Sequence, residues 1–109
     1  MSDQQGIKAA KRAGQVARAM LNDSIHYLLG ALELEQLRHE IGAYENDPDF
    51  IAFVAVKMEV ESIPDNEKLL ESLNDKNSPA HEIFAESVAW AKAISLTQCE
   101  ILAERYPQS

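Results

Sequence analysis

The stretch Asn46–Val56, NDPDFIAFVAV, decides the fold class of this chain. Asp47 can cap a helix, Pro48 suits the first helical position because its φ is preset, and the next carboxylate favours the positive end of the helix dipole. The apolar run that follows fits either a buried helix or a buried strand. The rest of the sequence offers no convincing second strand, and a lone strand leaves its hydrogen-bonding groups unpaired. We therefore expect a helix over Pro48–Glu61 and an all-α fold.

Apolar residues at three- and four-residue spacing predict helices on both sides of this segment. The first carries a stripe rich in alanine, and the second is apolar on two sides, which is typical of a helix that lies between neighbours. Capping by Ser24 and Ser78 and a stop at Gly42 set several boundaries. We expect an irregular up-and-down bundle of four main helices and one short helix, with the second and third most buried. The predicted helices are Gln4–Leu21, Ser24–Ile41, Pro48–Glu61, Asn66–Leu73 and Pro79–Arg105.

Length and composition limit the class of protein. The chain has 109 residues, of which 46% are hydrophobic and 26% charged, so one helical domain over residues 1–109 is expected. Its formal net charge of −8 disfavours nucleic acid as a partner, because phosphate binding needs clustered positive charge. Cys99 is the only thiol and cannot form a disulfide within the chain, and no apolar run is long enough to cross a bilayer. We expect a cytoplasmic protein with no membrane partner.

Charge is distributed unevenly along the sequence. Residues 23–75 contain thirteen acids and three bases, a net charge of −10, whereas residues 1–22 contain four bases and one acid, a net charge of +3. An acidic concentration of this kind raises association rates with a basic protein, which is therefore the expected class of partner. The alternative is that the basic first helix folds over the acidic middle and partly neutralises it. A homodimer through the alanine-rich first helix is compatible with either arrangement.

The sequence carries no dedicated catalytic signature. It lacks a phosphate-binding loop, a dinucleotide fingerprint, a zinc-binding helix motif and a nucleophile elbow. Glu35 and His39 are spaced for one helix face, but the chain has no second copy of such a pair, which a two-metal bundle would need. We therefore predict no catalytic residue, no cofactor and no metal ion.

A candidate functional cluster brackets the predicted third helix. Its carboxylates could bind a basic group, or Arg38 could organise them through a bidentate pair. The alternative is structural: Asp47 and Asp49 only cap the helix, and Arg38 ties the second helix to the loop after it. The candidate residues are Arg38, Glu40, Asp47, Asp49 and Glu59.

A pattern of acidic, aromatic and small residues runs through the middle of the chain. It reads Leu37-Arg38-His39-Glu40-Ile41-Gly42, then Asp47-Pro48-Asp49-Phe50, Phe53-Val54, Glu59 and Ile63-Pro64, with Gly30-Ala31 upstream. In this pattern the sequence resembles a family of small uncharacterised bacterial proteins, of the domain-of-unknown-function kind. The resemblance covers about residues 21–64, and the chain departs from it at Lys57-Met58 and over Leu69–Leu73. It implies one bacterial cytoplasmic domain, adds no activity, and would place any family site at the candidate residues above.

Two functions of different class follow as expectations. The first is a non-enzymatic interaction module whose acidic surface docks a basic protein, and its sharpest form is an immunity-type protein that covers a cationic toxin. The second is a small enzyme or metal-binding protein that uses Arg38 with the carboxylates of the candidate cluster. The two differ in a geometric requirement, because joint chemistry needs these side chains to converge on one accessible cleft.

Overall fold

The computed structural model describes residues 3–42 and 47–106, and Asn46 of the predicted capping motif lies outside them. The described residues form helices and no strand, so the all-α prediction is confirmed. They form four long helices, two short α-helices and one 3₁₀ turn, which differs from the predicted four main helices plus one short helix. The elements are α1 (Asp3–Leu21), α2 (Tyr27–Ile41), α3 (Ile51–Glu61), α4 (Asn66–Glu71), η1 (Ser72–Asn74), α5 (Ala80–Ile83) and α6 (Ala85–Arg105).

The extra elements come from two interruptions of predicted helices. The predicted last helix divides at Phe84, whose φ of −89° and ψ of 0° separate α5 from α6 and whose side chain is fully buried in the core. Backbone hydrogen bonds from Phe84 N to Ala80 O and from Val88 N to Phe84 O continue across this point, so the chain changes direction without a loop. The predicted short helix over Asn66–Leu73 ends at Glu71 and continues as the 3₁₀ turn η1.

The boundaries of α2 are set by different residues at its two ends. Ser24, the expected N-cap, lies in the bend after α1, and the helix begins at Tyr27. His26 is the N-cap instead, because its Nδ1 atom accepts a hydrogen bond from the backbone N–H of Leu28 at 3.2 Å. Gly42 ends the helix in the left-handed conformation, with a φ of 84°, as predicted. Glycine suits this position because a side chain there would be strained.

The α3 helix begins at Ile51, three residues later than predicted. Asp47 nevertheless organises the turn that precedes it. Its carboxylate accepts the backbone N–H of Asp49 at 2.9 Å, and its carbonyl accepts the backbone N–H of Ile51 at 3.0 Å. The apolar run that fitted either a helix or a strand is therefore helical from Ile51 to Glu61.

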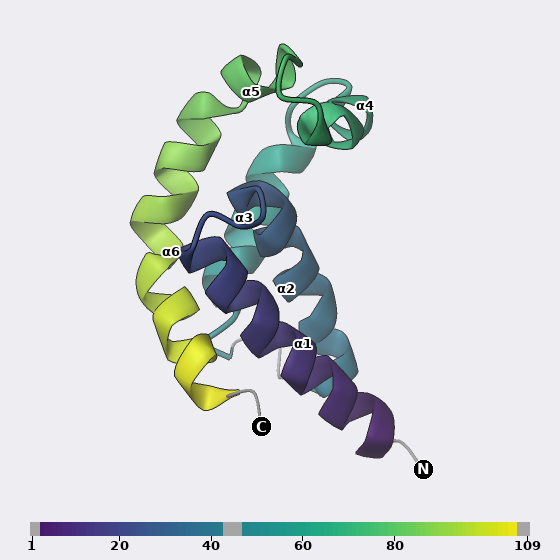
Figure 1. Cartoon of the computed structure of the whole chain (residues 1–109), viewed down its shortest axis with the longest axis vertical. Coiled ribbons are helices and arrows are strands. Elements are labelled where there is room, and N and C mark those ends of the chain that lie inside the picture. Colours follow the sequence, from purple (N-terminus) through teal and green to yellow (C-terminus); the bar gives the residue numbers. More distant parts are fainter. Residues whose placement is uncertain (1–2, 43–46, 107–109) are drawn as a thin grey trace.

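The long helices pack around one hydrophobic core (Figure 1). The α1 helix lies along α2 and α6, while α2 contacts α1, α3 and α6, which confirms that this helix with two apolar sides lies between neighbours. The bundle measures 42 × 25 × 25 Å, and the segment from α4 to α5 lies at the end opposite the first turns of α1 (Figure 1). No helix in the described part of the chain is both long and apolar enough to cross a membrane.

The first helix is more buried than the sequence indicates, so the prediction that the second and third helices are the most buried is right only for α2. Small residues are the reason for this burial, because they let α1 approach its neighbouring helices closely. A side-chain carbon added to Gly14 would overlap the carbonyl oxygen of Tyr106, and one added to Gly30 of α2 would overlap the side chain of Met20. The stripe on which the homodimer expectation rests is thus covered by the chain itself. Its core residues are Ala9, Ala13, Val16, Ala17 and Met20.

Candidate functional site

Arg38 lies on α2 in a nearly buried ion-pair cluster. Its Nε atom is 3.3 Å from Oε2 of Glu35, one turn earlier, and the two residues are only 8% and 5% exposed. Glu35 also lies 3.2 Å from Nε2 of His39 and 3.4 Å from Nζ of Lys57. The Nη1 atom of Arg38 is buried without a hydrogen-bond partner. Removal of Glu35 or Arg38 is costly, because the other of these two buried residues would keep its charge without its buried counter-charge.

Asp47 and Asp49 form a second cluster with a residue outside the predicted set. Arg105, at the end of α6, donates through Nη1 to Oδ2 of Asp49 at 2.6 Å and lies 3.6 Å from Oδ2 of Asp47. These contacts tie the start of α3 to the end of α6. Asp47 does not cap α3 as predicted, because the N-cap position is Phe50 and no side chain caps it, while the Asp47 carboxylate accepts the backbone N–H of Asp49 in the preceding turn. Asp49 has a partner that the sequence pattern did not indicate.

The remaining two candidates are exposed. Glu40 lies near the C-terminal end of α2, and Glu59 lies on α3. The structure brings Asp47 and Asp49 together, but not with Arg38, which has its own carboxylate partner. These contacts do not supply the single cleft that the enzyme alternative requires.

Glu59 lines an open hollow between α3 and α6. Glu86, Ser87 and Trp90 of α6 form the rest of its wall, and its volume is about 240 Å³. Trp90, the only tryptophan of the chain, is 38% exposed. Neither Glu59 nor Glu86 forms an ion pair with any residue in the described ranges. Two carboxylates beside an exposed indole are suited to the recognition of a cationic side chain.

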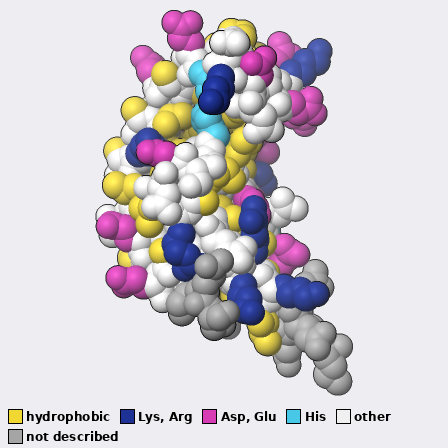
Figure 2. Space-filling view, viewed as in Figure 1, with side chains coloured by type: hydrophobic (Ala, Val, Ile, Leu, Met, Phe, Trp, Pro, Cys, Tyr) yellow, Lys and Arg dark blue, Asp and Glu magenta, His cyan; other side chains and the backbone are white. Residues whose placement is uncertain are grey.

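Among the described residues, one basic side chain of α1 pairs with a carboxylate of the acidic middle, and four further carboxylates there pair with bases from other elements. Arg12 pairs with Glu33 of α2, while Arg18 donates to two backbone carbonyls near the C-terminal end of α6. Lys8 and Lys11 form no ion pair with a residue that the structure describes. Figure 2 shows basic side chains gathered over α1 on one face of the molecule, with carboxylates mainly at the edges of that face. Within the described residues, neutralisation of the acidic middle by α1 is thus limited to the pair of Arg12 with Glu33.

The partners missed from the sequence differ in how much signal they offered. Glu35 and Arg38 are spaced by three on one helix, so their pairing is readable from the pattern. Arg105 is 56 residues from Asp49 in the chain, and no local spacing indicates that contact. Glu86 and Trp90 are spaced by four on α6, but their meeting with Glu59 depends on how α3 packs against α6. Within the described ranges, no group of three or more His, Cys, Asp or Glu residues could hold a metal ion.

Comparison of the chain with protein-family models, with curated proteins and with solved structures finds no match in any of the three. The resemblance to small bacterial proteins therefore stays a prediction. Inference about function rests on the chain's own geometry and charge.

Proposed function

We propose that this chain is a non-enzymatic interaction module whose acidic surface docks a basic partner protein. A lysine or arginine side chain of the partner occupies the hollow between Glu59 and Glu86 and lies against Trp90. The observation that carries the proposal is the presence there of two carboxylates that have no ion-pair partner among the described residues. An immunity-type protein that covers a cationic toxin is the sharpest form of this proposal. A cytoplasmic location belongs to it, since Cys99 is a free and buried thiol.

Exposed apolar side chains near the hollow support a protein as the partner. Met58 precedes Glu59 on α3, and it is among the most exposed apolar residues of the described chain. Ile101, also exposed, lies about 16 Å farther along α6 than Trp90 and on the same side of the helix, because eleven residues complete about three turns. Protein interfaces are enriched in tryptophan and methionine at their centre and polar at their rim. Exposed Trp90 and Met58 beside the carboxylates of the hollow therefore fit the centre of a protein interface with an acidic rim.

Typical interaction free energies indicate how much of the binding free energy the hollow between Glu59 and Glu86 contributes. A cation over an exposed indole contributes about 0.5–1 kcal/mol, and an exposed ion pair about 0.2–1 kcal/mol. Together the hollow therefore supplies roughly 1–2 kcal/mol, which is a factor of about 5–30 in affinity. The rest of the affinity comes from the wider acidic surface, which also speeds association.

Trp90 makes the proposal directly testable, because it is the only source of tryptophan fluorescence. We expect a short arginine-rich peptide to change this fluorescence saturably, and an uncharged peptide of the same length to leave it unchanged. The affinity should fall as the salt concentration rises, because exposed charge interactions are screened.

A pair of matched double variants separates the hollow from general acidity. Glu59→Gln with Glu86→Gln is expected to weaken binding of the peptide by about 2–30 fold, because two exposed ion pairs of about 0.2–1 kcal/mol each are lost while Trp90 stays. Glu100→Gln with Glu104→Gln removes the same charge from exposed positions roughly 15–20 Å along α6 from Trp90. This variant should weaken peptide binding by less than about twofold. Equal losses in the two variants, or a fluorescence change that never saturates, would count against this hollow as the seat of a cationic side chain.

A further inference from the structure

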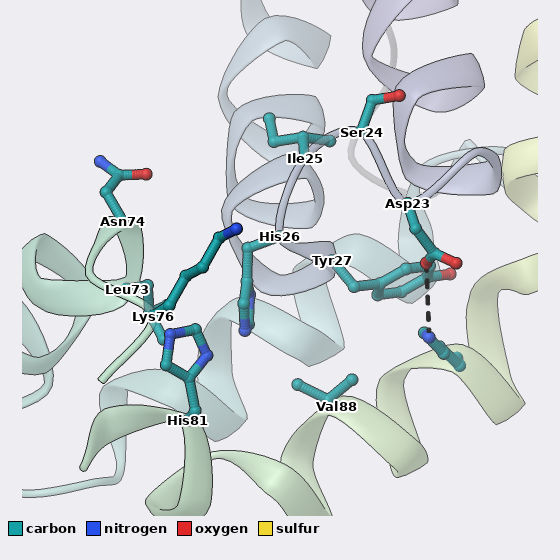
Figure 3. A pocket seen from close by; sticks show the side chains of 11 residues that line it. Asp23, Ser24, Ile25, His26, Tyr27, Leu73, Asn74, Lys76, His81 and Val88 are labelled. Atoms are coloured by element: carbon teal, nitrogen blue, oxygen red, sulfur yellow. Dashed lines mark ion pairs between the residues drawn. The ribbon is translucent and has the colours of Figure 1, made fainter. Parts of the chain in front are cut away.

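A second and larger hollow lies where the start of α2 faces η1, α5 and α6. Its volume is about 490 Å³. Figure 3 shows His26 and His81 pointing toward one another across it, with Lys76 beside them. Asp23 is the one acidic residue among those that line it. The basic or titratable nitrogen groups of the hollow belong to His26, Lys76, His81 and Lys92.

The charge of this hollow is opposite to that of the protein. The chain has 18 acidic residues against 10 lysines and arginines, yet two lysines and two histidines line this hollow with one carboxylate. That carboxylate, on Asp23, pairs with Lys92 at 3.8 Å and is 82% exposed, so it neutralises little inside the hollow. Lys76 forms no ion pair with a described residue. A region of unneutralised positive charge is the general requirement for anion binding.

The hydrogen bonds of the two histidines show which ring nitrogens face a ligand. Nδ1 of His26 accepts the backbone N–H of Leu28, so the neutral ring carries its proton on Nε2 and can donate it. Nε2 of His81 lies 2.9 Å from the carbonyl oxygen of Asp75, which only accepts, so Nδ1 of His81 is the nitrogen left for a further proton. The ring centroids are 5.6 Å apart. Both rings therefore have a nitrogen outside their structural hydrogen bonds.

The basic groups of the hollow already affect the pKa of His26. Burial lowers the pKa of His26, and the nearby His81 and Lys92 lower it further. Like charges have thus been brought together with only the exposed Asp23 among the lining residues to offset them. A bound anion would remove this repulsion.

We infer that this hollow binds a small molecule through a phosphate monoester group. Such a group carries about −1.5 to −2 charges at neutral pH and three acceptor oxygens, which match two lysine ammonium groups and the Nε2–H of His26. The volume exceeds that of one phosphate, and Ile25 and Val88 provide an apolar wall for the remainder of the ligand. This site is distinct from the Glu59 hollow and does not depend on it.

Histidine NMR gives a direct readout, because the chain has three histidines and one serves as an internal reference. Inorganic phosphate, added against chloride at constant ionic strength and pH, should shift the ring resonances of His26 and His81 saturably. The ring of His39, held at Glu35, should not follow. Glycerol 3-phosphate should shift the same two resonances at lower concentration, and equal or weaker binding than phosphate would overturn the assignment to an ester.

Matched lysine variants test the role of the hollow's charge. Lys76→Gln with Lys92→Gln is expected to weaken phosphate binding by about tenfold or more, and Lys8→Gln with Lys11→Gln, the same charge loss on exposed α1 positions, by less than about twofold. If the first variant fails to fold, Lys76→Gln alone should still weaken binding by about threefold. Parallel shifts of all three histidines, or equal losses in both double variants, would overturn the site.

Discussion

The phenol oxygen of Tyr27 lies 2.7 Å from the hydroxyl oxygen of Ser95 in the core, where it joins the first residue of α2 to the middle of α6. Ser95 donates its own proton to the carbonyl oxygen of Ala91 at 2.6 Å, so its oxygen accepts the proton of Tyr27. The Sγ atom of Cys99 lies 3.4 Å from the same phenol oxygen. These buried polar groups satisfy one another, and a buried polar atom left without a partner is costly.

Removal of the Tyr27 hydroxyl is expected to destabilise the protein. Tyr27→Phe should lower the free energy of unfolding by about 1–2 kcal/mol, because the acceptor of Ser95 is then buried without a donor. Tyr27→Phe with Ser95→Ala should cost less than the sum of the single changes, since neither partner is left behind. Urea unfolding near neutral pH measures both values. Strict additivity would show that this hydrogen bond is not the source of the loss.

Because the phenol of Tyr27 is buried, we expect the free energy of unfolding to fall at high pH. Burial raises the pKa of Tyr27, and its hydrogen bond with Cys99 adds to the rise. In the unfolded chain a tyrosine loses its proton near pH 10, so above about that pH the folded state binds more protons and the free energy of unfolding falls. The stability difference between the natural chain and Tyr27→Phe should therefore shrink between about pH 8 and pH 11. A constant difference over that range would contradict the prediction.

Close helix packing predicts opposite effects for two glycines of α1. Gly14→Ala would drive a side-chain carbon into the backbone carbonyl of Tyr106, which cannot rotate away, so we expect a loss of roughly 1–3 kcal/mol. Gly6→Ala would meet its nearest neighbouring atom, a carbonyl oxygen, at an ordinary 3.7 Å. It should be neutral or stabilise the helix by up to about 1 kcal/mol. Equal effects in thermal unfolding would refute the close approach of α1 to the end of α6.

The all-α fold could be predicted because its signals are local. The two apolar sides of α2 indicated its central place, and Gly42 marked its end, since both features depend on the helix itself. One error lies where distant contacts decide and the other is a local choice between two neighbouring caps. Phe84 turns its ring into the core and divides the last helix, and His26 caps α2 in place of Ser24.

The candidate site was predictable only in part, for the same reason. Glu59 belongs to the predicted set, but its neighbours Glu86 and Trp90 come from a helix far along the chain. One of the two interpretations of the cluster had Arg38 organise the aspartates, but Arg38 pairs with Glu35 and Arg105 contacts the aspartates instead. Residue type and charge were readable in the sequence, whereas the choice of partner depends on which helices touch.

Because the Glu35 carboxylate is buried, its loss should destabilise the protein far more than the loss of the Glu33 carboxylate on the same helix. Glu35→Gln should lower the free energy of unfolding by about 3 kcal/mol or more, because Arg38 stays buried without its counter-charge. Glu33→Gln breaks the exposed pair with Arg12 and should cost about 0–1 kcal/mol. Urea unfolding of the two variants gives the comparison. A cost for Glu35→Gln as small as that for Glu33→Gln would mean that the Arg38 cluster is solvated.

The cap at the start of α2 predicts a loss of stability in mild acid. Burial, His81 and Lys92 lower the pKa of His26, so the folded state keeps this ring neutral where the unfolded chain binds a proton. The unfolded state then binds more protons, and the free energy of unfolding falls as the pH drops below about 6.5. Protonation would also remove the Nδ1 acceptor for the N–H of Leu28. His26→Asn keeps a side-chain acceptor at the N-cap and has no such titration, so its stability should decline less between about pH 7.5 and pH 5.5. Urea unfolding in phosphate-free buffer measures the two declines, and equal declines would show that His26 is not their source.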